Sequence, residues 1–464
     1  MNGQNEVADD QITSEQLLVA DREKSQSNDS LRKSWFSRTF SPMTEGGIRG
    51  NIFLLIITTL GSSFFYLPYL ARKTGLFSTI LMVTFNAILG YICSRVLYLG
   101  FKQTKAKTYS ECMELLLGRK MGFLSNVIIL IHTIGAVMST WIFSYRFLLN
   151  GLLQLLQLPE NGPFAKNFLL SFFPGGFALI FLVSLFGSTE KLKKISLMGI
   201  FLIIYLIIVF VYLTPEYFNY YDQRNEIQIK GVIWSWYMLK LWGITNYMYL
   251  NQYAIMPICA NTTNVNFKRV TKIIRRSIMA VFLIYVLICF CGYFSLPSDS
   301  DNDIFLLRPP LPGDPDRLIM WGKILFGMAL FVGVLVKSHF MLIYFEQLIG
   351  MFKDVFLQRQ PTGGAMAAEL SQSNKTPLYI RKFCFLLTHA VLTFFGIDNL
   401  SKILGFVGSF VGVFEVIIIP GYMFLAIDKE RGLIKSSTRW LLIEGMVLMS
   451  IVSFAAVVYN ILVK

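Results

Sequence analysis

The chain repeats one feature along most of its length: runs of about 20 apolar residues, the length a helix needs to cross a bilayer core. Its mean hydropathy is +0.55, and 54% of its residues are hydrophobic while only 15% are charged, which argues against a soluble domain. The alternating pattern of barrel strands is absent, so we predict an all-α integral membrane protein embedded in the lipid bilayer. Eleven transmembrane helices are predicted, over residues 50–70, 75–99, 122–155, 164–187, 195–213, 232–258, 277–296, 318–352, 378–396, 403–426 and 440–463.

Basic residues alternate from one side of these runs to the other. The N-terminal segment to Arg49 holds six Lys and Arg residues, alternate loops after it hold 22, and the intervening loops hold eight. Positive residues concentrate on the cytosolic side of membrane proteins, which predicts a cytosolic N-terminus. The net charge of +14 therefore indicates topology, and no nucleic-acid partner is expected. We predict a disordered cytosolic tail over residues 1–48 and one transmembrane domain over 49–464.

Two of the runs contain residues that weaken helices. The first reads LGSSFFYLPY over residues 60–69, and the sixth reads LWGITNYMYLNQYAIMPI over residues 241–258. A break at membrane depth frees backbone groups that only a cavity or a ligand can satisfy, as in the discontinuous helices of transporters. A simple kink at a helix crossing is the alternative for the first run alone. Breaks in runs one and six are spaced as an inverted five-plus-five repeat requires.

Short motifs in the same order as the runs resemble those of a known family, the amino acid/auxin permeases. The first run is similar to the family pattern G-S-G-x-L-x-L-P-Y-A, and TYSECMELLLGRKMG (108–122) is similar to the segment that leads into its third span. AIMPICANT (254–262) resembles the motif closing span six, and IYVLICFCGYFSL (284–296) resembles span seven. The residues that match the first motif and the glycine after it are Gly61, Ser62, Leu67, Pro68, Tyr69 and Gly75.

The resemblance spans about residues 46–463 and implies an eleven-span LeuT-type transporter that moves amino acids by alternating access. A half-helix dipole would hold the substrate carboxylate, and freed carbonyls would hold its amino group. Ser63 stands where the family has a second glycine, which indicates an altered pocket. The residues we place around the substrate are Gly61, Ser62, Ser63, Phe65, Asn246, Tyr247, Tyr249 and Asn251.

A lysine lies far from either end of the eighth run, in FVGVLVKSHFMLIYFE (331–346). Such a residue is costly in lipid and should face a cavity or a partner. In LeuT-type transporters that use sodium, a sodium site lies between span one and span eight, and the resemblance places Lys337 and Ser338 near it. The Lys337 ammonium group could replace the charge of sodium and exchange protons with the medium. The alternative is a side chain that extends to the cytosolic face.

We add His132 to the ion-coupling residues because imidazole titrates near neutral pH, although a lone helical histidine is more often a packing residue. His339 and His389 are weaker candidates of the same kind. Lys240 and Glu415 are further intramembrane charges, and a pairing between them is conceivable but does not follow from the sequence. None of the Cys and His residues has the spacing of a metal site, so no metal is expected.

The sequence therefore predicts a secondary transporter for amino acids, proton-coupled or a uniporter rather than sodium-coupled. The alternative is a sensor that binds an amino acid without transporting it and signals through the cytosolic tail. Nucleotide-binding and hydrolase motifs are absent, so we expect neither an enzyme nor a cofactor. We expect a monomer in the vacuolar or lysosomal membrane or in the plasma membrane.

Overall fold

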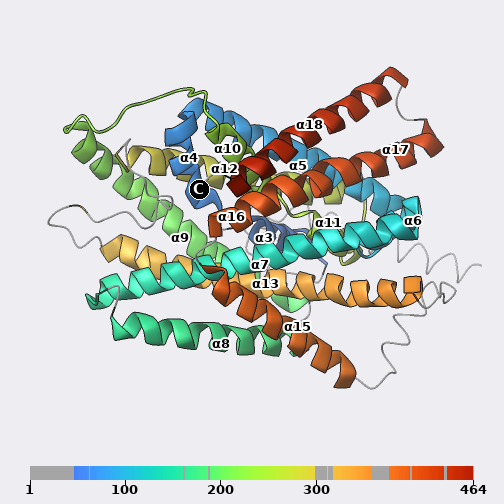
Figure 1. Ribbon diagram of the computed structural model, residues 1–464, viewed down its shortest axis with the longest axis horizontal. Helices are drawn as coiled ribbons and strands as arrows, with labels where there is room; N and C mark the ends of the chain where they lie inside the picture. Colours follow the sequence, from blue (N-terminus) through green and yellow to red (C-terminus); the bar gives the residue numbers. More distant parts are fainter. Residues whose placement is uncertain are drawn as a thin grey trace, which may run out of the picture. The chain divides into compact units, whose positions relative to one another are not determined.

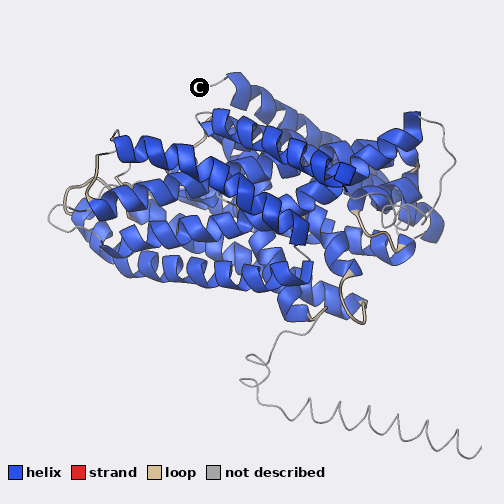
Figure 2. Cartoon of the chain, turned by 90° about the horizontal axis from the view of Figure 1, so that it is seen from below, coloured by secondary structure: helices blue, strands red, loops and turns tan. Residues whose placement is uncertain are grey.

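Helices make up nearly all of the chain that the structure describes. The computed structural model describes residues 46–61, 63–159, 162–186, 189–297, 311, 317–356, 376–397, 400–432 and 436–462. Figure 2 shows these residues as helices joined by loops, and they contain no strand. Most of the predicted N-terminal tail, residues 1–45, and the predicted site residue Ser62 lie outside the described residues.

Eight long helices carry most of the apolar sequence: α5 (Leu76–Thr104), α7 (Arg119–Leu156), α8 (Pro163–Phe186), α9 (Thr189–Asp222), α12 (Phe267–Phe294), α13 (Arg317–Phe356), α15 (Thr376–Phe395) and α18 (Ser436–Leu462). Between α15 and α18 the chain forms α16 (Leu400–Phe406), the π-helical turns η4 (Val407–Val411) and η5 (Phe414–Ile418), and α17 (Ile419–Arg431). The short elements are α3 (Ile48–Thr59), the 3-10 turn η1 (Ser63–Tyr66), α4 (Leu67–Thr74), α6 (Tyr109–Leu117), α10 (Tyr237–Met248) and α11 (Gln252–Ala260).

The predicted membrane architecture is confirmed at the level of its class. Within the described residues nine helical segments are long and apolar enough to cross a bilayer, and ten if α3 is joined with η1 and α4. The predicted span that is missing from these ten is the sixth. Its residues form α10 and α11, which have 12 and 9 residues, and each helix is too short to cross a bilayer alone. The count of eleven therefore stays a prediction.

Burial separates central helices from helices at the periphery. Helices α7 and α13 are mostly buried and pack against each other along the middle of the bundle (Figure 1). Helices α8 and α18 bury only a small share of their residues. Along α18 the exposed apolar side chains include Leu441, Val447, Leu448, Ile451 and Phe454. Large apolar side chains on an outer surface suit contact with lipid tails, where hydrocarbon replaces water.

Glycines permit close approach at two places that position the site. Gly75, with φ +93°, lies between α4 and α5 in a conformation that side chains rarely adopt, and a Cβ there would collide with the carbonyl of Gly231. In η4, a Cβ on Gly408 would meet the backbone oxygen of Gly243 in α10. Small residues allow helix backbones to approach closely in membranes, so η4 packs directly on α10.

Candidate functional site

The first predicted break falls between α3 and η1. Helix α3 ends at Thr59, Leu60 adopts an extended conformation with φ −64° and ψ 100°, and helical structure resumes in η1 at Ser63. Pro68 lies in the first turn of α4, where its missing N–H removes no helical hydrogen bond. The last carbonyls of α3 lack helical partners because no further turn of the helix follows to supply N–H groups.

The second interruption separates α10 from α11 and is supported by its own side chains. Helix α10 ends at Met248 and α11 begins at Gln252. The Gln252 side chain accepts a hydrogen bond from the Asn251 backbone N–H at 2.8 Å and donates one to the Tyr249 carbonyl at 3.3 Å. One buried amide thus satisfies two backbone groups that a continuous helix would have paired.

The two interruptions lie against each other. The hydroxyl of Tyr285 in α12 lies 3.1 Å from the carbonyl of Thr59 and 2.9 Å from the carbonyl of Met248, so it can donate to the end of either broken helix. The Asn251 side-chain amide donates to Thr59 Oγ1 at 2.7 Å. Residues about 190 positions apart in the sequence are joined here by buried polar contacts.

We expect Tyr285→Phe to destabilise the protein, since it leaves the two helix-end carbonyls without this donor. A lost buried hydrogen bond of this kind costs about 1–3 kcal/mol. The measurement is the apparent melting temperature in detergent, beside Tyr212→Phe, which changes an exposed tyrosine of α9. Equal melting temperatures for the two variants would show that the Tyr285 hydroxyl does not support the interruptions.

Most of the predicted substrate residues lie around these interruptions. A Cβ added to Gly61 would lie 3.6 Å from the Tyr247 ring and 3.7 Å from Ser63 Oγ. Tyr247 shares a hydrogen bond of 2.7 Å with Ser139, and Asn246 donates to the Gly408 carbonyl at 3.0 Å. Four buried polar atoms in this region have no hydrogen-bond partner in the described structure: Ser63 Oγ, Tyr249 Oη, Asn251 Oδ1 and Ser338 Oγ. Such atoms are costly unless a ligand or water pairs with them.

Phe65 is placed differently from the other predicted substrate residues. Its ring packs within 4.9 Å of the Phe326 ring and 5.1 Å of the Phe147 ring, measured between centroids. Phe64 lies beside it at 4.2 Å. These rings form an aromatic cluster of η1, α7 and α13, so Phe65 contributes apolar packing next to the first interruption.

Lys337 reaches the backbone of the first interruption. Its ammonium group donates to Thr140 Oγ1 at 3.0 Å and to the Leu60 carbonyl at 3.5 Å, and the residue is 2% exposed. The side chain therefore does not extend to the membrane surface. The Lys337 Nζ thus lies between α3, α7 and α13, where it bonds a carbonyl freed by the helix break.

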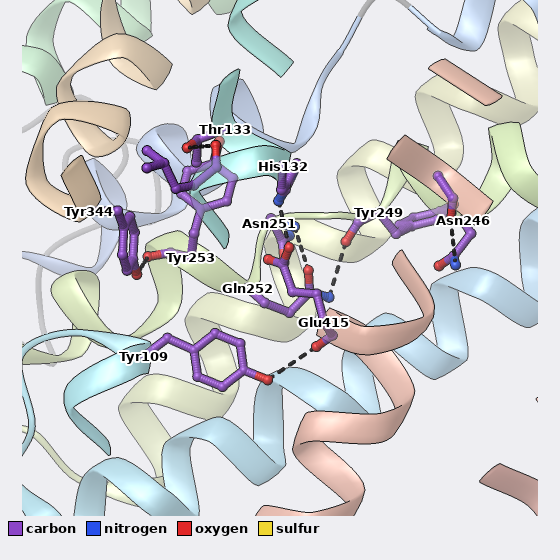
Figure 3. A network of polar contacts seen from close by, with 12 residues as sticks. Tyr109, His132, Thr133, Asn246, Tyr249, Asn251, Gln252, Tyr253, Tyr344 and Glu415 are labelled. Carbon is purple, nitrogen blue, oxygen red and sulfur yellow. Dashed lines mark hydrogen bonds and ion pairs between the residues drawn. The ribbon is translucent and has the colours of Figure 1, made fainter. Parts of the chain in front are cut away.

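His132 contacts Glu415, an intramembrane charge for which the sequence alone identifies no partner. Its Nδ1 lies 2.6 Å from Glu415 Oε2, and both side chains are buried. Figure 3 shows Glu415 between His132 and Tyr109, whose hydroxyl donates to the Glu415 carbonyl at 3.2 Å. Lys240, the partner considered for Glu415, instead lies 5.5 Å from the centre of the Tyr69 ring.

Sequence reasoning missed three residues that organise this region. Thr140 and Thr59 carry ordinary hydroxyl groups on apolar helices, and nothing in their local sequence distinguishes them. Tyr285 is part of the span-seven resemblance, yet its contact with both interruptions requires the folded chain. Within the described residues no group of three or more His, Cys, Asp and Glu side chains could hold a metal ion.

The apolar helices define a multi-pass integral membrane protein, and comparison with known sequences gives its family. The family model described as transmembrane amino acid transporter protein matches residues 44–463, so the chain belongs to this family. The predicted family is thereby confirmed, and it is a family of transporters rather than of enzymes.

Individual relatives are distant. "Putative amino acid transporter AAT1" of Plasmodium berghei (strain Anka) is 22% identical over 64% of this chain and 47% of the relative. The protein of the same name from Toxoplasma gondii (strain ATCC 50611 / Me49) is 21% identical over 59% of this chain and 37% of the relative. The chain thus spans less than half the length of these two curated relatives.

A solved structure shows a related fold. The substrate-bound, outward-open structure of a Na+-coupled sialic acid symporter superposes with a TM-score of 0.54 at 14% identity, covering 90% of each chain. At this identity the likeness concerns the fold alone.

Proposed function

We propose that this chain is a secondary carrier that moves amino acids across a membrane by alternating access. The observation that carries the proposal is the contact between two interrupted helices at Tyr285, with unpaired polar atoms around it. Family membership supports amino acids as the substrate class. We further propose eleven spans in a LeuT-type five-plus-five repeat over residues 49–464, with discontinuous spans one and six.

The substrate would bind at the two interruptions through its charged ends. Helix N-termini carry partial positive charge, so the start of a half-helix after either interruption suits the carboxylate. The carbonyls at the ends of α3 and α10 suit the amino group. The residues that we assign to the substrate remain Gly61, Ser62, Ser63, Phe65, Asn246, Tyr247, Tyr249 and Asn251.

We propose that Lys337 makes sodium unnecessary. Its ammonium group lies against the Leu60 carbonyl, where a coupling cation would otherwise be needed to satisfy the freed backbone. A resident positive charge disfavours a second cation at the same place by direct repulsion. Transport is therefore proton-coupled or uniport, with Ser338 and His132 as further ion-coupling residues. We also propose a monomer with a cytosolic N-terminus, in a vacuolar, lysosomal or plasma membrane.

Uptake by reconstituted protein tests the proposal. Proteoliposomes and empty liposomes are given a radiolabelled amino acid mixture, with and without unlabelled mixture inside to drive exchange. We expect labelled amino acids to enter only the proteoliposomes, and faster when exchange is possible. Binding of the mixture to the purified protein without uptake would contradict a carrier and support the amino acid sensor instead.

A further inference from the structure

A second buried ionisable site lies apart from Lys337. His132 and Glu415 form a close pair, and both side chains are buried. On α7, His132 precedes the Lys337 partner Thr140 by eight residues, which corresponds to about 12 Å along the helix axis. The pair is thus a separate feature of the bundle.

One oxygen of the Glu415 carboxyl group has no partner. Oε2 contacts His132, while Oε1 is buried and makes no hydrogen bond in the described structure. An unpaired carboxylate oxygen away from water is strongly unfavourable. A proton on Oε1 removes the charge that needs a partner, whereas a carboxylate beside a neutral imidazole leaves a net negative charge in the interior.

Within the part of the chain that the structure describes, the titratable groups recorded around Glu415 include one that can be cationic. The titratable side chains that interact with it are His132 of α7, Cys93 of α5, Tyr109 of α6, Tyr253 of α11 and Tyr344 of α13. Thiol and phenol groups are neutral or negative, so His132 is the cationic partner within this set. The charge of the site therefore depends on how many protons the pair holds.

The site is connected to the second interruption. The Cys93 thiol and the Tyr109 hydroxyl both contact the backbone carbonyl oxygen of Glu415. Gln252 lies beside the Cys93 side chain and also hydrogen-bonds the backbone between α10 and α11. Figure 3 shows Gln252 and Asn251 beside Glu415. A change at Glu415 can thus reach the backbone of the proposed substrate site through two side chains.

Glu415 lies on an irregular helix. It belongs to the π-helical turn η5, which follows the π-helical turn η4 after two residues. π-helical turns are rare and often occur at functional sites, because the wider turn weakens the regular backbone pairing. The backbone around Glu415 therefore departs from regular α-helical geometry.

We propose that the His132–Glu415 pair is the site that binds the coupled proton, and that Glu415 Oε1 accepts it. The proton comes from the aqueous medium and converts the carboxylate to a neutral carboxyl group, while the contact between Oε2 and His132 Nδ1 is kept. Loss of the negative charge changes the hydrogen bonding around Gln252, which links proton binding to the interruption between α10 and α11. The inference rests on the proposed carrier function and names the site of its coupling ion.

Infrared difference spectroscopy tests proton binding without any transport. Purified full-length protein is compared at about pH 8 and at about pH 5, on either side of the ordinary pKa of imidazole. We expect wild type to gain the carbonyl-stretch band of a protonated buried carboxyl group and Glu415→Gln to lack that gain. Glu216→Gln, which changes an exposed carboxylate of α9, should behave as wild type. No band in wild type, or an equal band in Glu415→Gln, would overturn the inference.

Transport measurements distinguish a failure of this inference from a failure of the proposed carrier function. We expect accumulation driven by an imposed pH gradient to fall about tenfold in Glu415→Gln and in His132→Gln, and to be unchanged in Glu216→Gln. Melting temperatures close to that of wild type establish that the variants are folded. Full pH-driven accumulation in folded Glu415→Gln overturns the inference and leaves the carrier intact. Absence of any amino acid flux in wild type overturns the carrier itself.

Discussion

We expect Lys337→Met to lose pH-driven amino acid accumulation by about tenfold or more. The substitution keeps an unbranched side chain and removes the ammonium group that bonds the Leu60 carbonyl and Thr140. The Leu60 carbonyl then loses this donor, at about 1–3 kcal/mol, while Thr140 Oγ1 keeps its hydrogen bond to the Ala136 carbonyl. About 1.4 kcal/mol corresponds to a tenfold change in rate. The measurement is uptake into proteoliposomes under a fixed pH gradient.

Two further variants separate charge from proton exchange at this position. Lys337→Arg keeps a positive charge that is not released, so a fixed charge at this position predicts more pH-driven accumulation in Lys337→Arg than in Lys337→Met. Lys102→Met changes an exposed lysine near the end of α5 and should transport as wild type does. Accumulation by Lys337→Arg as low as that of Lys337→Met would contradict a role for Lys337 as a fixed charge.

A large loss of stability is expected for Gly408→Ala. The new methyl group would collide with the backbone oxygen of Gly243, and backbone cannot move aside as a side-chain end can. Overpacking of this kind costs about 3 kcal/mol. The separation of η4 from α10 would also disturb the hydrogen bond from Asn246 to the Gly408 carbonyl. Fluorescence-detected melting in detergent should show a clearly lower melting temperature and a lower yield of monodisperse protein.

The same substitution elsewhere in the membrane region gives the control. Gly445 lies in α18, and a Cβ there meets no atom within 4 Å. Because alanine favours a helix over glycine by about 1 kcal/mol, Gly445→Ala should be neutral or slightly stabilising. If both variants melt like wild type, the close crossing of η4 and α10 does not limit stability.

The class of fold follows from the sequence because its signal is long and redundant. A run such as that of α13 needs only its apolar length to indicate a span, and nine to ten helical segments satisfy that test within the described residues. The sixth span is harder. Asn246, Asn251 and Gln252 lower its apolar character at the place where the backbone departs from a helix, so the residues that mark the interruption also weaken the signal for a span.

The candidate site could be predicted in part. Helix-breaking chemistry in the sequence points to Gly61, Ser63 and Asn251, and the cost of a charge in lipid points to Lys337. Their partners could not be identified in this way. Tyr285, Thr59 and Thr140 meet the site through contacts between distant parts of the chain. Phe65 shows the converse: its neighbours in sequence place it at the interruption, while its ring packs with Phe147 and Phe326.

Glu415 illustrates how charge and contact together change an interpretation. The sequence marks it as an expensive residue and leaves a pairing with Lys240 open without deriving it. The structure pairs it with His132 and leaves one of its oxygens without a hydrogen bond. Neither the pairing nor the unpaired oxygen has a local sequence signal, because both arise from the packing of α7 against η5.

The most direct test of the account is amino acid accumulation by wild-type protein in liposomes under an imposed pH gradient, measured with sodium and with sodium replaced by choline. A carrier with Lys337 in place of a coupling cation should take up amino acids equally in both media. It should accumulate them along the pH gradient if it is proton-coupled and only equilibrate them if it is a uniporter. Accumulation that requires sodium would contradict the assignment of Lys337 and with it the proposed basis of coupling.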